Sequence, residues 1–315
     1  MKVNKEEDEM RRRMKKQGEK SNGGSTFDKA YGIKSPQAVG KLRNMFNAEK
    51  AGHGGTLDPL ATGLLPIAFG EATKTVQWAM DGAKIYRFTA AWGAETNTDD
   101  LEGEITNRSD IRPSDAEIEA VLPQFTGAIM QAPPAFSAIK IAGERAYDLA
   151  RAGEVVEMKE REVHVDSLKL VKAAEDHAEF EITCGKGTYI RSLARDMGRK
   201  LGCLAHVSAL RRLKVGGLHE AQMISLEKLE KMGIGGASEA LQSVLLPLET
   251  VLDGIPALAV LDADAAKLRQ GQTVLLRGAN APISEAAVLI RCDNQPIAIG
   301  EISQGFLKTK RLFNL

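Results

Sequence analysis

The segment KAGHGGTLDPLATGLLPIAFGEATK, residues 50–74, places the tightest limits on how this chain can fold. Gly54 and Gly55 permit backbone shapes that other residues resist, and Asp58, because it precedes a proline, is pushed toward extended geometry. Surface turns are usually polar, yet residues 60–70 are mostly small and apolar. This pattern predicts a loop packed into the protein with its carboxylate directed at a cleft. Taken alone, the tripeptide LDP also fits an ordinary turn with a solvated carboxylate.

The composition is that of a folded chain with no dominant charge. Hydrophobic residues make up 43% of the 315 residues, which is enough for a substantial core. Lysine plus arginine equals aspartate plus glutamate at 42 each, so local clusters must attract any polyanionic partner. Residues 185–200 form a basic cluster, whereas acidic residues gather at 95–119.

Three features bear on metal binding and location. The cysteines, Cys184, Cys203 and Cys292, are widely spaced and lack a zinc-ligand pattern, so we interpret them as reduced core thiols. No run of 18 apolar residues predicts a membrane span, and the N-terminus is charged where a signal peptide would be apolar. We therefore expect a cytoplasmic protein with no metal site and no membrane contact.

The sequence pattern predicts an α+β protein with two domains. Residues 1–25 mix both charges and end in serine and glycine, so we expect a disordered tail, or less simply a basic arm for RNA. The Pro- and Ala-rich segment 130–160 is expected to be mobile, and the brief apolar runs of 247–315 predict a separate small β domain. Period and capping signals predict helices at 35–50, 72–81, 114–122, 190–201 and 263–270, and strands at 85–92, 162–171, 178–184 and 206–217.

Arg191 is a second indication of a site. If Thr188 is the N-cap of the helix, the macrodipole disfavours a cation at Arg191 by roughly a few tenths of a kcal/mol, so an anion should compensate. We predict an ion pair with Asp58, which would favour the ionised carboxylate. Arg195 and Arg199 follow at four-residue spacing, and we interpret them as a solvated basic stripe.

His53, Tyr86 and Tyr189 each allow a structural and a functional interpretation. His53 fits a structural role, and no second histidine lies nearby to form a metal site, so stacking or hydrogen bonding to a flexible partner is the functional alternative. Tyr86 and Tyr189 stand beside cationic residues, where unpaired bases can stack, and core packing fits both equally well.

Whole motifs resemble the tRNA pseudouridine synthase B family, the bacterial tRNA pseudouridine-55 synthases. Residues 51–74 are similar to the catalytic motif of that family nearly letter for letter. The segments KIYRF, PPAFSAIKIAGERAYDLARAG, GKGTYIRSLARDMGRKLG and HVSALRRLKVG resemble its later motifs in the same order. The resemblance covers about residues 27–315.

The resemblance implies a particular architecture. A catalytic domain at 26–246 would have a mixed, mainly antiparallel central sheet flanked by helices, and a small β-barrel-like PUA domain at 247–315 would bind RNA. The segment 130–160 would close over the RNA. One departure is GGSTFDKAYG near the start, which lacks the apolar run of the family and has Ala30 in place of proline, so we expect a less stable first strand.

The resemblance also implies an activity: one uridine in the T-loop of tRNA, position 55, would be flipped out and isomerised to pseudouridine without a cofactor. Asp58 would be the nucleophile, Tyr86 the ring stacked on the uracil and Arg191 the partner of the carboxylate. The other matching positions would bind RNA: His53 in place of the extruded base, Tyr189 and Leu210 in the pocket, and Lys29 and Lys74. The partner would be the T-arm of tRNA, bound by a monomer with no obligatory protein partner.

Two other functions remain open. A non-catalytic RNA-binding or tRNA-folding chaperone would use the same basic residues and small β domain without chemistry. An Asp-dependent hydrolase of a nucleoside or glycosidic bond would need a second carboxylate. The next carboxylate after Asp58 in the sequence is Glu71.

Overall fold

The computed structural model describes residues 21–137, 139–141, 143–152, 158–233, 238–252, 254–278 and 280–315. Most of the expected tail, residues 1–20, lies outside these ranges. None of the helices in the described ranges has the length and apolar composition that a membrane crossing requires. The three cysteines are buried and unbonded, which confirms their interpretation as core thiols.

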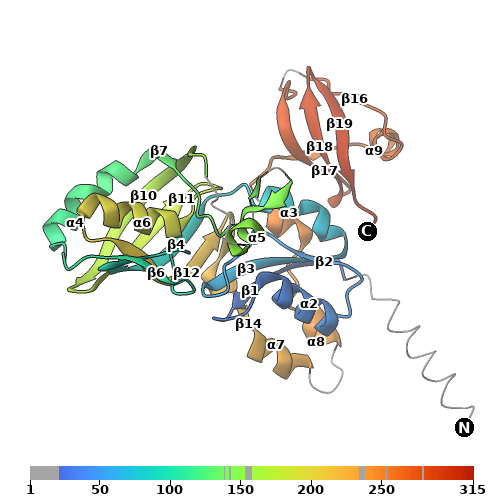
Figure 1. Ribbon diagram of the computed structural model, residues 1–315. Coiled ribbons are helices and arrows are strands. Elements are labelled where there is room, and N and C mark those ends of the chain that lie inside the picture. The colour runs from blue at the N-terminus through green and yellow to red at the C-terminus, as the bar shows by residue number, and fades with distance from the viewer. Residues whose placement is uncertain are drawn as a thin grey trace, which may run out of the picture.

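A mixed sheet of ten strands forms the centre of the described chain (Figure 1). Its path is β14–β1–β3–β12–β4–β11–β10–β7, with β13 attached to β12 and β2 to β3. All neighbours are antiparallel except β1 with β14 and β3 with β12, which confirms the expected sheet type. The strands are β1 (Gly23–Lys29), β2 (Ala51–His53), β3 (Thr62–Phe69), β4 (Lys84–Trp92), β7 (Gly127–Gln131), β10 (Arg161–Ala174), β11 (His177–Cys184), β12 (Ala205–Val215), β13 (Leu218–His219) and β14 (Ile224–Ser225).

Two hydrophobic clusters cover different halves of this sheet. The cluster under α6 (Ile190–Leu201) and α4 (Asp115–Val121) includes Phe88 and Phe180, and the cluster under α2 (Ser35–Met45), α7 (Leu226–Gly233) and α8 (Ser238–Gln242) includes Phe27 and Phe69. In Figure 1, α4 and α6 accordingly lie over one half of the sheet, away from α2, α7 and α8. Tyr86 of β4 and Leu210 of β12 pack against both clusters, so they mark the seam between the halves.

The remaining elements of the first part are short. They are η1 (Gly70–Thr75), α3 (Val76–Ala79), β5 (Ala94–Thr96), β6 (Ile105–Arg108), η2 (Leu122–Phe125), β8 (Lys140–Ile141), β9 (Glu144–Arg145), α5 (Ala146–Arg151), η3 (Glu220–Gln222) and η4 (Leu248–Leu252). β8, β9 and α5 fall within the segment expected to be mobile, of which residues 138, 142 and 153–157 lie outside the described residues. The expectation that this segment moves stays a prediction.

The C-terminal part contains a separate, curled five-stranded sheet in the order β15–β17–β18–β19–β16. Its elements are β15 (Ala257–Ala259), α9 (Asp262–Arg269), β16 (Val274–Leu275), β17 (Glu285–Cys292), β18 (Gln295–Ser303) and β19 (Phe306–Leu312). An apolar cluster joins it to the rest of the chain and contains Ala72 of η1, Leu252 of η4 and Phe313. The fold is therefore α+β with a small β unit at its end, as expected.

The first strand corrects the expected tail boundary. β1 begins at Gly23, inside the segment assigned to the tail, and pairs with β3 along its whole length. The small residues have a packing reason: a Cβ on Gly23 would lie 2.9 Å from the carbonyl oxygen of Leu246. The neighbouring Gly24 exchanges two backbone hydrogen bonds with Leu246, at 2.8 and 2.7 Å. Glycine here permits close backbone contact rather than disorder.

The first helix also differs from expectation. α2 ends at Met45 rather than near residue 50, because Asn47 takes a left-handed backbone conformation with φ 46°. Lys34 is the N-cap, so Ser35 is the first residue of the helix, with its hydroxyl free for another role.

Two helical glycines give a prediction about packing. A Cβ on Gly198 of α6 would lie 2.4 Å from the backbone nitrogen of Ala205, whereas nothing among the described residues lies within 4 Å of a Cβ on Gly40 of α2. We expect Gly198→Ala to lower the free energy of unfolding by at least about 2 kcal/mol through overpacking. Gly40→Ala should raise it by about 0.5 to 1 kcal/mol because alanine favours helix. Urea denaturation followed by circular dichroism measures both, and a shift of the same sign would contradict the close packing of α6 on β12.

Candidate active site

The loop between β2 and β3 carries Asp58, and side chains from other elements hold its backbone. The hydroxyl of Ser35 in α2 donates to the carbonyl of Leu57 at 2.8 Å and accepts from the amide of Leu57 at 2.9 Å. Both backbone groups of the residue before Asp58 are thus satisfied by one buried side chain. Ser35, the first residue of α2, thus fixes this loop.

Lys29 of β1 holds the other side of Asp58. Its side chain is fully buried, and its Nζ donates to the carbonyls of Ala30, Ile33 and Pro59 at 3.0, 2.8 and 3.1 Å. Burial lowers the pKa of Lys29 to about 8, and the nearby charge of Asp58 opposes that fall. The expectation that Lys29 contacts RNA is contradicted in this conformation, because the ammonium is enclosed and already has three acceptors.

Arg212 of β12 holds the start of the loop. Its guanidinium is buried and donates from Nη2 to Gly55 at 3.0 Å, from Nη1 to Thr56 at 3.4 Å and from Nε to Leu64 at 2.7 Å. All three acceptors are backbone carbonyls. Arg212 was not identified from the sequence, although the sequence contained an indication of its position. Arg212 is two residues after Leu210 on the same strand, so both side chains lie on the same face of the sheet.

The carboxylate of Asp58 pairs with Arg191, as predicted. Nε of Arg191 lies 2.9 Å from Oδ2 of Asp58, in an ion pair whose direction does not meet hydrogen-bond geometry. The arginine side chain is 7% exposed and that of the aspartate 35%. The anion therefore has a buried cation on one side and remains accessible on the other.

The start of α6 differs in detail from expectation. Tyr189, rather than Thr188, is the N-cap, so Arg191 is the second residue of the helix. The side chain of the N-cap residue makes no capping hydrogen bond. Instead, Oε1 of Gln131 accepts a hydrogen bond from the amide of Tyr189 at 2.8 Å. Nε2 of Gln131 donates back to the carbonyl of Tyr189 at 3.1 Å. The argument that a cation near this helix start needs an anion still holds.

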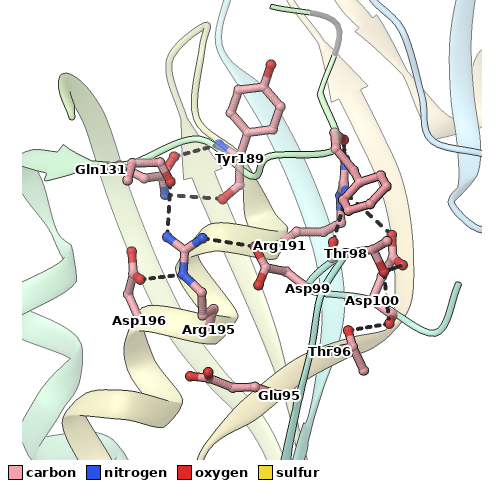
Figure 2. Close-up of polar contacts among 12 residues, drawn as sticks. Glu95, Thr96, Thr98, Asp99, Asp100, Gln131, Tyr189, Arg191, Arg195 and Asp196 are labelled. Carbon is pink, nitrogen blue, oxygen red and sulfur yellow. Dashed lines mark hydrogen bonds and ion pairs between the residues drawn. The ribbon is translucent and has the colours of Figure 1, made fainter. Parts of the chain in front are cut away.

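Arg191 is shared between several acceptors (Figure 2). Its Nη1 donates to the carbonyl of Thr98 at 2.8 Å and lies 3.5 Å from Oδ2 of Asp100, and its Nη2 donates to the carbonyl of Phe136 at 3.1 Å. Asp100 is fixed in turn, because its Oδ1 accepts from the Thr98 hydroxyl at 2.5 Å. These contacts leave Nε as the part of the guanidinium that faces Asp58.

The interpretation of a solvated basic stripe is wrong for Arg195, whose side chain is 11% exposed, whereas Arg199 is 56% exposed and also pairs with a buried carboxylate. Figure 2 shows the side chains of Arg191 and Arg195 directed at the strand and turn that carry the acidic residues. Nη1 of Arg195 lies 2.9 Å from Oδ2 of Asp99, and Nε and Nη2 of Arg199 bind the carboxylate of Glu95 at 2.6 and 3.0 Å. Burial raises the pKa of Asp99 to about 6, and the charge of Arg195 opposes that rise. The acidic segment and the arginine face of α6 thus neutralise each other.

The aromatic candidates lie around this centre. Tyr86 and Leu210 are half-buried at the seam between the two clusters, and burial raises the pKa of Tyr86, a shift that the charge of Arg212 opposes and that of Asp58 reinforces. The phenol is therefore neutral at neutral pH. The guanidinium of Arg161 lies 5.4 Å from the centroid of the Tyr189 ring. Tyr189 is therefore held by Arg161 at its ring and by Gln131 at its backbone.

His53 and Lys74 occupy the margins. His53 ends β2, and burial followed by the charge of Arg212 lowers its pKa below 6.5, so the ring is neutral at pH 7. Nζ of Lys74 donates to Oε2 of Glu71 at 2.6 Å and to the carbonyl of Leu312 at 2.8 Å. Lys74 thus faces the C-terminal sheet, whereas Asp58 pairs with Arg191, and Tyr86 and Leu210 pack against both hydrophobic clusters.

Comparisons with known proteins agree with this geometry. Residues 43–190 match the model of the TruB family pseudouridylate synthase (N terminal domain), and residues 191–253 that of the tRNA pseudouridylate synthase B C-terminal domain. Residues 256–313 match the model described as pseudouridine synthase II TruB, C-terminal.

Relatives and solved structures extend the likeness to nearly the whole chain. The tRNA pseudouridine synthase B of Mesorhizobium japonicum is 48% identical, over 96% of this chain and 99% of its own. That of Bradyrhizobium diazoefficiens is 54% identical, over 93% and 86%. The crystal structure of a Cbf5-Nop10-Gar1 complex superposes with a TM-score of 0.72 over 93% of this chain and 85% of that chain, at 24% identity, which shows the fold alone.

The fold and the arginine-paired aspartate are those of a pseudouridine synthase. With relatives near 50% identity along almost its full length, the chain belongs to the TruB family of pseudouridylate synthases.

The buried lysine gives a prediction about pH. An unfolded lysine titrates near 10.5 and Lys29 near 8, so between these values the unfolded chain binds more protons. This group therefore adds stability as the pH rises from 8 toward 10.5. We expect the free energy of unfolding of the wild type, relative to Lys29→Met, to increase between pH 7.5 and 9.5 in urea denaturation. A difference independent of pH would show that Lys29 titrates normally.

Proposed function

We propose that this protein converts one uridine in the T-loop of tRNA, position 55, to pseudouridine, with Asp58 as the nucleophile. The observation that carries the proposal is the position of this carboxylate: a third exposed, paired with a buried guanidinium, on a loop held from three sides. The names of the relatives, tRNA pseudouridine synthase B, support the substrate and the reaction.

The reaction detaches uracil from C1′ of ribose, turns the base and rejoins it through C5. It needs an anion near C1′ or C6, a pocket for the free base and the exclusion of water. Asp58 supplies the anion, and Arg191 keeps it oriented without covering its exposed side. The C1′–N1 bond is broken and the C1′–C5 bond is formed. C5 loses a proton and N1 gains one, so no group is consumed.

The base must leave its stack before the chemistry begins. Extrusion costs about a few kcal/mol, and stacking on one aromatic ring returns roughly 1 to 3 kcal/mol. Tyr86 at the seam between the two clusters is the stacking ring, with Leu210 and Tyr189 lining the pocket beside it. A neutral His53 takes the space of the extruded base without adding charge.

The rest of the chain fits an RNA ligand. Residues 26–246 act as the catalytic domain and 247–315 as a PUA-like RNA-binding domain. The segment 130–160 closes over the bound T-arm, and its described start is tied to α6 through Gln131 and through the carbonyls of Ala132 and Phe136. The protein acts as a cytoplasmic monomer on tRNA and needs no protein partner.

A glycosidic hydrolase is disfavoured by the placement of the other carboxylates. Such enzymes use two carboxyl groups that flank the scissile bond. Glu71 accepts from Lys74 and from the amide of Asn314, at 2.6 and 2.8 Å, and so belongs to the contact with the C-terminal part. Asp100 lies beside Arg191 with its side chain 8% exposed.

Asp58→Asn tests the assignment. The amide keeps the shape and removes the anion, so we expect the variant to bind a T-arm transcript as tightly as the wild type. Turnover should fall by at least about 10⁴-fold, as for other lost nucleophiles. Tritium released from C5-labelled uridine measures turnover, and the salt dependence of binding reports the phosphate contacts.

The matched control is Asp176→Asn, which changes an exposed carboxylate in the turn between β10 and β11. It should leave turnover unchanged. Full turnover by Asp58→Asn would exclude Asp58 as the nucleophile, binding without turnover by the wild type would favour a chaperone, and free uracil among the products would favour a hydrolase.

A further inference from the structure

Arg212 has no role in the chemistry described above. Its side chain nevertheless donates hydrogen bonds to two backbone carbonyls of the loop that carries Asp58. The guanidinium is buried at 2% residue exposure, and a buried charge is costly unless it is fully hydrogen-bonded. It has no carboxylate partner among its hydrogen bonds; its acceptors are the carbonyls of Gly55, Thr56 and Leu64. The chain thus keeps a buried cation whose contacts are the backbone of one loop and the strand that follows it.

The backbone of Arg212 is itself fixed. β12 pairs with β3 at Arg212 and Gly63, so closely that a Cβ on Gly63 would lie 2.3 Å from the carbonyl oxygen of Arg212. Gly63 has φ 97°, a conformation that suits glycine, so the contact requires this residue. The strand therefore fixes the backbone position from which the Arg212 side chain reaches the loop.

The same guanidinium acts on Tyr86. Arg212 and Tyr86 are directly opposite each other on β12 and β4, where side chains on one face of a sheet are in contact. Burial raises the pKa of the Tyr86 phenol, and the nearby charge of Arg212 opposes that rise. One side chain therefore touches both the loop that carries the nucleophile and the ring proposed to stack on the base.

We propose that Arg212 is a positioning residue that sets the distance between Asp58 and Tyr86. It does so by holding the carbonyls of Gly55 and Thr56 through hydrogen bonds and by lying beside Tyr86, its cross-strand neighbour on β4. Arg191 orients the carboxylate itself, whereas Arg212 fixes the backbone from which that carboxylate extends. This inference rests on the proposed function for its kinetic part only.

The kinetic consequence follows from the geometry. A misplacement of about 1 Å can cost about 100-fold in rate even when binding is intact. We expect Arg212→Met to lower kcat for a T-arm transcript by about 100-fold with KM changed by less than about threefold. Arg212→Lys keeps the charge but cannot reach all three carbonyls at once, so it should recover part of kcat.

Arg211→Met is the matched control. Arg211 is the adjacent residue of β12, with its side chain 35% exposed and paired with Asp28 and Glu220 rather than with the loop. Its loss removes a cation of the same type from the same strand. We expect unchanged kcat and KM.

A second measurement does not depend on activity. Hydrogen–deuterium exchange of the free proteins, followed in peptides covering residues 54–61, should be at least about tenfold faster in Arg212→Met than in the wild type. Peptides from α6 should be unchanged, and Arg211→Met should match the wild type throughout. If Arg212→Met does not fold by circular dichroism, Arg212→Lys carries both comparisons.

The two measurements separate the proposals. If the wild type makes no pseudouridine, the proposed function fails, and the exchange data alone decide the role of Arg212. If the wild type is active but the Arg212 variants keep both kcat and slow exchange of residues 54–61, the positioning role is overturned. A loss of kcat with unchanged exchange also overturns it, because the loop would then be fixed without Arg212.

Discussion

A buried guanidinium beside one partly exposed carboxylate is the interaction on which the rest of this structure depends. Arg191 lies inside the protein, where a charge is stable only if it is paired and hydrogen-bonded. Its Nη1 and Nη2 donate to backbone carbonyls, and its charge pairs with Asp100 and, through Nε, with Asp58. The surrounding elements keep that last contact in place: Ser35, Lys29 and Arg212 hold the backbone on both sides of Asp58. Gly55, with φ 98°, allows the backbone of the loop to take a conformation in which these side chains can bind its carbonyls.

The acidic and basic segments of the chain are far apart in the sequence but form ion pairs with each other in the structure. Acidic residues of 95–100 and the arginines of α6 are about a hundred positions apart, and they meet in ion pairs at 2.6 to 2.9 Å. Two cations of the basic cluster, Arg191 and Arg195, are therefore used inside the protein, whereas Lys186, Arg199 and Lys200 remain exposed. Because Asp99 and Arg195 are both largely buried, each charge makes the burial of the other tolerable.

Two hydrophobic clusters on one sheet give the site its location. Each cluster has its own helices, and two partly buried side chains, Tyr86 and Leu210, contact both clusters. A third cluster and the contacts of Lys74 and Glu71 join the C-terminal sheet to η1, which directly follows β3. The loop that carries Asp58 and the C-terminal unit are thus connected through one strand, β3, which begins after the loop and ends at that contact.

The sequence by itself determined the local features: the alternation of β10 and β11, the capping box of α4, the amphipathic α6 with Gly202 at its end, and the pairing of Asp58 with Arg191. These depend on period, on turn chemistry and on the need of a cation near a helix start for an anion. Only the tertiary structure decided which polar residues are internal. Lys29, Arg195 and Arg212 look like surface cations in sequence, and Gly23 and Gly24 look like a linker. Their roles depend on carbonyls and carboxylates supplied by segments far away in the chain, and no local pattern records which distant segment comes within hydrogen-bonding distance.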